Sequence, residues 1–219
     1  MTAAKSKKPV RIPDYTVAEE IGNAVSHGLG ALFGLFAMIL MGIRADSVLS
    51  FICGMVYGLS MVLLYATSCV YHAVPASDLL KGPLRIADHC MVFLLVLGSC
   101  VPVFLRGIGG TTGWCLFSFV LGSSLLGIVL TLWDMDRTEK LCAALHLLNG
   151  WSVAVGFHWL VDSIGWQGTG WLLSGGIVYS AGVVFFALGA SKRFMHGVFH
   201  LFCLAGTVLQ FIGICFYVL

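Results

Sequence analysis

The chain has 219 residues, of which 59% are hydrophobic and only 10% are charged, and its formal net charge is +2. Soluble domains carry about a quarter charged residues, so the composition argues against a soluble protein and predicts a membrane protein. The basic residues do not gather into a binding face, so we expect no nucleic-acid partner.

The N-terminal region is basic and polar. We expect residues 1–15, "MTAAKSKKPVRIPDY", to form a flexible cytoplasmic tail, and residues 16–219 to form one transmembrane domain. The next letters, "TVAEE", have the spacing of a capping box, in which Thr16 and Glu19 bond to each other's backbone N–H groups. This pattern predicts a short helix at the membrane surface, ahead of the first apolar stretch.

The rest of the chain is a series of long apolar stretches separated by Gly- and Pro-containing joints such as "PASDLLKGP" and "RGIGGTTG". A bilayer core of about 30 Å needs about 20 apolar residues per helix. On that scale the sequence predicts an all-α membrane protein, a seven-transmembrane helix bundle. The predicted spans are 24–43, 48–72, 86–105, 112–132, 141–161, 169–190 and 196–218.

The distribution of lysine and arginine predicts the orientation of this bundle. Short loops that are rich in Lys and Arg stay in the cytoplasm. The N-terminal side would carry ten such residues and the other side only Arg44 and Arg106, so the N-terminus is predicted to be cytoplasmic and the C-terminus outside. The ten are Lys5, Lys7, Lys8, Arg11, Lys81, Arg85, Arg137, Lys140, Lys192 and Arg193.

Ionisable and polar residues of three predicted spans would lie at one depth, near the cytoplasmic face. The second span ends with Ser68 and His72, and the third would have Asp88 in its first turn. The seventh span begins with "HGVFH", which contains His196 and His200. Ionisable residues inside a membrane are costly, so a group of them at one depth indicates a functional site.

The residue types and their spacing point to zinc. Residues four apart share a helix face, so His196 and His200 can reach one point together. Three imidazoles and a water form the open tetrahedral arrangement of catalytic zinc, which predicts His72 as the third ligand. Asp88 and Ser68 would be neighbouring groups that orient the ligands or the water.

Simpler interpretations of the same residues stay open at this point. The two histidines of "HGVFH" would also suit an interface where they face headgroup water. Asp88 would also suit a helix N-terminus, where the macrodipole favours a carboxylate, and Ser68 would also suit a bond to its own helix carbonyl. Asp88 and the adjacent His89 point about 100° apart, so only one of them is expected to face the site.

Four segments of the chain resemble the hemolysin III family, the bacterial branch of the progestin and adiponectin receptor superfamily. These segments are "EEIGNAVSHGLG" at 19–30, "SCVYH" at 68–72, "RIADHCMVFLLVLGSCVP" at 85–102 and "HGVFH" at 196–200. The resemblance implies a seven-helix bundle with zinc near the cytoplasmic face. It implies His72, His196 and His200 as the ligands, with Asp88 rather than His89 at the site and Ser68 beside it.

The sequence departs from the family pattern at two places. Relatives often have G-S-Y-T-P where this chain has "GSCVP", with Cys100 and Val101, and often carry a histidine where this chain has Gln210. Neither change involves a proposed ligand. His27 and His146 are interpreted as structural or interfacial, although His146 would also suit the mouth of a cavity.

These observations predict a multi-pass protein of the bacterial inner membrane that acts on membrane lipids. The resemblance implies a zinc-dependent lipid amide hydrolase, similar to a ceramidase, in membrane lipid homeostasis. Asp88 and Ser68 would then be catalytic, and an acyl-chain substrate or fatty-acid product would occupy the bundle cavity. The alternatives are a non-catalytic sensor or receptor that zinc stabilises, and a cytolysin, as the family name suggests.

Overall fold

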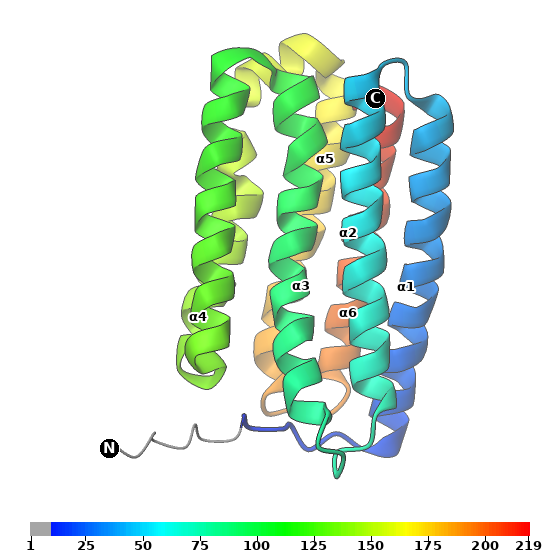
Figure 1. Cartoon of the computed structure of the whole chain (residues 1–219), viewed down its shortest axis with the longest axis vertical. Helices are drawn as coiled ribbons and strands as arrows, with labels where there is room; N and C mark the ends of the chain where they lie inside the picture. Colours follow the sequence, from blue (N-terminus) through cyan, green and yellow to red (C-terminus); the bar gives the residue numbers. More distant parts are fainter. Residues whose placement is uncertain (1–9) are drawn as a thin grey trace, which may run out of the picture.

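The computed structural model describes residues 10–219, and this part of the chain is helical with no β-strand. Figure 1 shows the long helices lying side by side as a bundle. Of the expected tail 1–15, residues 1–9 lie outside the described residues, and residues 10–16 have no regular secondary structure. The helices are α1 (Val17–Arg44), α2 (Val48–Ala73), α3 (Lys81–Val101), η1 (Pro102–Ile108), α4 (Gly110–Trp151), η2 (Ser152–Ala154), α5 (Phe157–Gly189), α6 (Met195–Gly213) and η3 (Ile214–Val218).

The ends of the bundle differ in which helices begin there. α1, α3 and α6 begin, and α2 ends, at the bottom of Figure 1, which we call the basal end. The C-terminus lies at the opposite end, which we call the apical end. All the polar residues singled out in the sequence for a zinc site therefore belong to helix ends that meet at the basal end.

The predicted capping box is confirmed, but the predicted short surface helix is wrong. The Thr16 hydroxyl accepts a hydrogen bond from the Glu19 backbone N–H, and the Glu19 carboxylate accepts one from the Thr16 backbone N–H. The helix that begins there runs without a break to Arg44. The reason is that "GNAVSHGLG" contains no proline, and its apolar face continues into the span.

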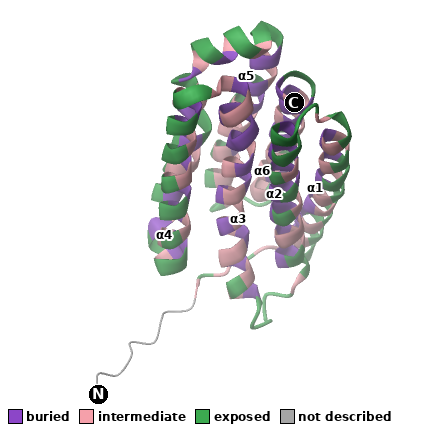
Figure 2. Ribbon diagram, turned by 45° about the horizontal axis from the view of Figure 1, so that its top comes forward, coloured by how far each residue is buried: buried purple, intermediate pink, exposed green. Residues whose placement is uncertain are grey.

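The burial pattern of α1 is that of a membrane helix, with polar and small residues inside and large apolar residues outside. Figure 2 shows exposed residues on the outward faces of the bundle. A helix whose exposed face is apolar suits lipid rather than water. The buried residues of α1 are Glu19, Asn23, His27, Gly30, Gly34, Ala37 and Met41. Its exposed apolar residues include Ile21, Val25, Leu29, Leu32, Phe36, Ile39 and Ile43.

Glycines let α1 and α2 approach closely, as small residues do at helix interfaces in membranes. A Cβ atom added at Gly58 would lie 2.4 Å from the Met38 Cβ atom and 2.7 Å from the Met38 Cα atom. Because one of these atoms belongs to the backbone, the two helices would have to move apart to accept a methyl group. The close contact holds α1 beside α2, which carries part of the site.

We expect Gly58→Ala to destabilise the bundle by about 1–3 kcal/mol, because the added methyl group overpacks this helix interface. The measurement is the Tm of the purified protein in detergent. Gly122→Ala in α4 is the matched control, since a Cβ atom there meets nothing within 4 Å and alanine is the better helix former. A Gly58→Ala protein as stable as the Gly122→Ala protein would contradict this account.

Two residues inside the long helices have non-helical backbone angles. Asp134 in α4 has φ −159° and ψ 88°, and Gly165 in α5 has φ 69° and ψ 174°. The Asp134 carboxylate accepts a hydrogen bond from the Arg137 backbone N–H, as a side chain does when it caps a new helix. A positive φ with extended ψ is open essentially to glycine alone, which explains the residue at 165. Figure 1 shows α4 folding back on itself at the basal end.

The helix is interrupted within the predicted span 141–161. The α-helix ends at Trp151 and is followed by the 3-10 turn η2 before α5 begins at Phe157. Gly150 and Gly156 flank this break and weaken the helix, and the Ser152 hydroxyl donates a hydrogen bond to the Asn149 carbonyl. By contrast, the predicted spans 48–72 and 196–218 agree within one residue with α2 and with α6 plus η3.

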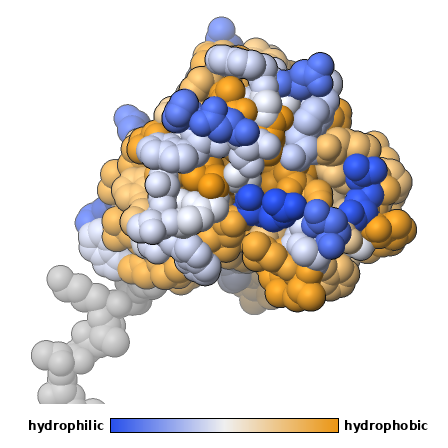
Figure 3. Space-filling model, turned by 90° about the horizontal axis from the view of Figure 1, so that it is seen from above, coloured by the Kyte–Doolittle hydropathy of each residue, from blue (hydrophilic) through white to orange (hydrophobic). Residues whose placement is uncertain are grey.

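Within the described residues, five helical segments are long and apolar enough to cross a membrane. They are Val17–Arg44, Val48–Ala73, Lys81–Ile108, Gly110–Gly189 and Met195–Val218. Seen from above, hydrophilic side chains gather on the end face and hydrophobic ones surround it (Figure 3). These features are those of a multi-pass helical membrane protein.

Candidate metal centre

Three helices bring the predicted ligands and their neighbours to the basal end. His72 lies in the last turn of α2, and His196 and His200 lie in the first turns of α6. Asp88 is not in the first turn of its helix as predicted, because α3 already begins at Lys81, about two turns earlier. The stabilisation of a carboxylate by the helix dipole falls off within the first turn, so helix capping does not explain Asp88.

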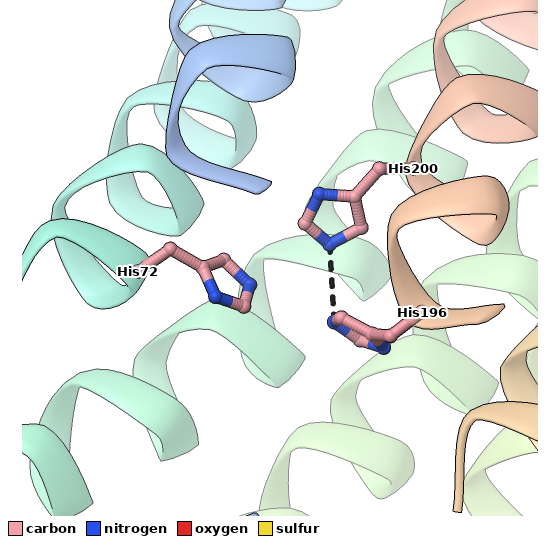
Figure 4. A group of neighbouring side chains, drawn as sticks. All are labelled: His72, His196 and His200. Atoms are coloured by element: carbon pink, nitrogen blue, oxygen red, sulfur yellow. Dashed lines mark hydrogen bonds between the residues drawn. The ribbon is translucent and has the colours of Figure 1, made fainter. Parts of the chain in front are cut away.

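The three predicted ligands lie together. One ring nitrogen from each of His72, His196 and His200 lies within 4.8 Å of the others. In Figure 4 the rings of the two α6 histidines and the ring of His72 point toward one another across the gap between α6 and α2. The Nε2 atoms of His196 and His200 are 3.1 Å apart. His72 and His200 are almost completely buried, with exposed fractions of 2% and 1%.

Residues of α1 lie close to the Nδ1 atoms of His72 and His200. The Glu20 carboxylate lies 2.6 Å from the His72 Nδ1 atom. The Ser26 hydroxyl donates to the Asn23 carbonyl, and its oxygen lies 3.5 Å from the His200 Nδ1 atom. The His72 Nε2 atom is buried and has no hydrogen-bond partner among the described residues. Two Nδ1 atoms therefore face α1, and the Nε2 atoms face the centre of the cluster.

Tyr15, just before α1, lies against the cluster. Its ring stacks on the His196 ring at a centroid distance of 5.1 Å, and lies 5.9 Å from the His72 ring. The chain before it is held in place because the Arg85 guanidinium bonds to the Arg11 carbonyl and the Arg11 backbone N–H donates to Asp136. Burial raises the pKa of the Tyr15 hydroxyl, so this side chain stays neutral at physiological pH.

A cavity of about 200 Å³ lies between the helices and reaches the cluster. Most of its wall is apolar, with residues such as Leu64, Val92, Phe104, Leu172 and Phe199. The polar residues that line it include His27, Ser68, Asp88, His89, Glu139, His146, His196 and His200. The arrangement combines a mainly apolar chamber with a group of nitrogen, carboxylate and hydroxyl donors at one end.

The surroundings of Ser68 and Asp88 can be compared with the simpler interpretations of these residues, which were a bond to the helix carbonyl for Ser68 and a helix N-terminus for Asp88. The Ser68 hydroxyl is buried and forms no hydrogen bond to its own helix carbonyl, and the side chain it interacts with is the Asp88 carboxylate. Asp88 is buried and interacts electrostatically with His72. Asp88 and His89 both line the cavity, and the expectation that only one of them faces the three histidines stays a prediction. The cavity is wide enough to meet two side chains that diverge along α3.

The family of the chain follows from its similarity to known proteins. The model of the family described as "Haemolysin-III related" matches residues 15–211, which is most of the chain and includes every residue of the cluster. The chain belongs to the haemolysin III-related family. Its resemblance to this family over the four quoted segments is therefore confirmed.

Curated relatives extend over nearly the whole chain. Hemolysin-3 of Bacillus cereus is 33% identical over 217 residues, which cover 98% of both chains. The hemolysin-3 homolog of Bacillus subtilis (strain 168) is 32% identical and covers 93% of this chain and 96% of its own. The monocyte to macrophage differentiation factor of Homo sapiens is 23% identical, covering 91% and 84%. The last similarity connects this haemolysin III-related chain to the progestin and adiponectin receptor superfamily.

The structure adds residues near the cluster that the sequence analysis did not assign to the site. His27, interpreted as structural or interfacial, is buried, lines the cavity and stacks on His200 at a centroid distance of 3.5 Å. Glu20 and Tyr15 were not singled out, although Glu20 lies in the segment "EEIGNAVSHGLG". A usable signal was the helical spacing of Glu20, Asn23 and His27, which places three polar side chains on one side of an apolar helix.

Proposed function

We propose that this haemolysin III-related protein binds zinc through His72, His196 and His200 and uses it to hydrolyse a membrane lipid, with a lipid amide as the substrate class. The observation that carries the proposal is the convergence of three imidazoles, of which His196 and His200 line a mainly apolar cavity. The process served would be membrane lipid homeostasis.

The donor set fits zinc in type and spacing. Neutral imidazole is a common zinc ligand, and two nitrogens bound at about 2.05 Å to a tetrahedral ion lie about 3.3 Å apart. The Nε2 atoms of His196 and His200 are separated by 3.1 Å. The His72 Nε2 atom is buried without a partner, which is a costly state unless something binds it. A catalytic zinc site has three protein ligands and one open position, which matches three histidines.

We propose that the chain crosses the membrane seven times, with a cytoplasmic N-terminus and the site near the cytoplasmic face. The segment Gly110–Gly189 has 80 residues, which as one straight helix would be about 120 Å long at about 1.5 Å per residue, four times a bilayer core of about 30 Å. Reversals near Asp134 and Gly165 would divide it into three crossings. Together with the other four segments this makes seven.

The orientation is supported by where the described basic residues lie. Lys81 and Arg85 belong to the first turns of α3, and Arg11 and Arg85 both bond to Asp136 near the reversal of α4. Arg44 and Arg106 lie at the other end, where Arg106 pairs with Asp46. Because lysine and arginine are retained in the cytoplasm, the basal end would be cytoplasmic. We propose the bacterial inner membrane as the location of the chain.

The residues around the cluster suit hydrolysis of a lipid. Zinc, when bound, supplies Lewis-acid chemistry that activates water and polarises a carbonyl group. The Asp88 carboxylate would accept the proton of the attacking water, and the Ser68 hydroxyl, which is buried beside Asp88 and lines the cavity, would donate to the substrate oxygen. The apolar wall of the cavity would hold an acyl chain and exclude bulk water.

We expect purified protein in lipid nanodiscs to release fatty acid from a ceramide-type amide. Release should stop when a chelator removes the metal and return when zinc is added back, because the ligands are protein side chains that survive metal removal. The measurement is mass spectrometry of released fatty acid over a panel of amide and ester lipids. Protein that carries one zinc ion per chain and releases no fatty acid from the whole panel would contradict the proposal.

A further inference from the structure

We propose that Glu20 is a positioning residue for the metal site. Its carboxylate holds the His72 ring in the tautomer that has its proton on Nδ1 and a free lone pair on Nε2, and Lys81 holds Glu20 in place. The inference deepens the proposed function, on which the metal part of it rests, and adds a role for α1, which carries none of the three proposed ligands.

The tautomer of His72 follows from which atoms its ring nitrogens face. A carboxylate accepts hydrogen bonds and cannot donate, so the nitrogen that contacts it must carry the proton. The Glu20 Oε2 atom is 2.6 Å from the His72 Nδ1 atom, whereas the Asn23 amide nitrogen is 3.5 Å from the same atom. The shorter, charge-assisted contact dominates and places a proton on Nδ1, so in the neutral ring Nε2 carries none and has a free lone pair.

Lys81 fixes the carboxylate that orients His72. Its Nζ atom donates to the Glu20 Oε1 atom at 2.7 Å and to the Tyr71 and Val74 carbonyls at 2.7 and 2.9 Å. These three bonds use all the donors of an ammonium group, and the side chain is only 1% exposed. The lysine therefore joins the last turn of α2 to α1 directly beside His72.

Each member of this group needs the others. A buried ammonium is costly without an opposite charge, so the Glu20 carboxylate compensates Lys81. The two oxygens of the carboxylate are divided, with Oε1 on Lys81 and Oε2 on His72. A carboxylate held in this way can rotate very little, and it aims the His72 Nε2 atom at the two histidines of α6.

The expected consequence for metal binding is large. Without an acceptor at Nδ1, a neutral imidazole can place its proton on Nε2, where it would block the ligand atom. Outer partners of ligating histidines commonly contribute about 10–100-fold to metal affinity. The loss expected from removing the Glu20 carboxylate is therefore of that size.

The test compares two variants at neighbouring glutamates. Glu20→Leu combined with Lys81→Met removes the carboxylate without leaving an ammonium buried alone, so it limits the damage to folding. Glu19→Gln is the control, because Glu19 is also buried but bonds to Thr16 and to the Phe194 backbone N–H and does not contact His72. Zinc affinity is measured by competition with a fluorescent chelator.

The double variant should bind zinc about 10–100-fold more weakly than the wild type, because loss of a partner outside the ligand set commonly reduces metal affinity by that factor. The zinc affinity of Glu19→Gln should stay within about twofold of the wild type. A folded double variant with wild-type zinc affinity would overturn the inference. Glu20→Gln is the conservative variant, because its amide oxygen can still accept a hydrogen bond from Nδ1. Its zinc affinity should lie between that of the double variant and that of Glu19→Gln.

A second measurement does not depend on zinc or on the folding of any variant at Glu20. Nitrogen-15 NMR of histidine-labelled, metal-free wild-type protein reads the tautomer of each ring, and the His72 signals are assigned by their absence in His72→Ala. We expect a protonated Nδ1 and an unprotonated Nε2 at mildly alkaline pH. A proton on Nε2 of His72 would overturn the inference. Failure of the wild type to bind zinc would overturn the proposed function, and the NMR measurement on metal-free protein would still test the tautomer of His72.

Discussion

His200→Ala is expected to remove zinc from the protein and, with it, fatty-acid release. Wild-type protein should contain one zinc ion per chain, and the variant should contain almost none after dialysis. The physical reason is that the substitution removes one of three proposed ligands. The expected loss of affinity therefore exceeds the roughly 10–100-fold that removal of a residue outside the ligand set commonly causes. The measurement is elemental analysis of the purified protein, together with the lipid-release assay.

A matched histidine elsewhere in the chain separates this effect from a general one. His158 in α5 is exposed and pairs with Asp162, away from the cluster. His158→Ala should retain both zinc and turnover. Circular dichroism and Tm should show that the His200→Ala protein is folded. A folded His200→Ala protein that still carries one zinc ion per chain would show that the cluster is not the metal site.

Asp88→Asn is expected to leave zinc in place and to reduce turnover by about 10²–10⁴-fold, the usual contribution of a general acid or base. Asparagine has nearly the same shape as aspartate but cannot accept a proton from water at neutral pH. Because Asp88 is buried beside the cavity and is not a proposed ligand, the change should affect the reaction and not the metal. The measurement pairs kcat for lipid release with zinc content.

The same variant decides between an enzyme and a protein in which zinc only joins α2 to α6. In the non-catalytic case Asp88→Asn would keep its fold, its zinc and its effect on the membrane. Asp46→Asn is the control, since Asp46 lies in the apical loop between α1 and α2 and pairs with Arg106. If Asp88→Asn and Asp46→Asn both retain wild-type turnover, Asp88 is not the proton acceptor.

Most of the helices could be predicted from the sequence, because apolar length and Gly or Pro joints are local features of the chain. α2 and the pair α6 and η3 agree with the prediction within one residue. Hydropathy did not show the interruption inside the predicted span 141–161, where Ser152 bonds back to Asn149 and the helix breaks. The prediction failed at the start of α1, where one helix continues into the span from its capping box. Where a helix begins or is interrupted depends on local glycines and side-chain hydrogen bonds, which hydropathy does not register.

The sequence by itself determined which residues can belong to the candidate site. Helical spacing puts His196 and His200 on one face, and the position of His72 at the end of its apolar stretch puts it at the same depth. These are properties of single helices, so they can be read from each segment alone. The convergence of the three rings was thus an expectation from depth and spacing, and the structure brings them within 4.8 Å.

Only the tertiary structure decided which neighbours surround those rings. The rotation of each helix about its axis depends on how it packs against the others, and hydropathy fixes only the depth of a residue. Close packing of α1 against α2 turns Glu20 toward His72, and the packing of α3 places both Asp88 and His89 on the cavity. Contacts of this kind join segments far apart in the chain, and they exist only once the helices have packed.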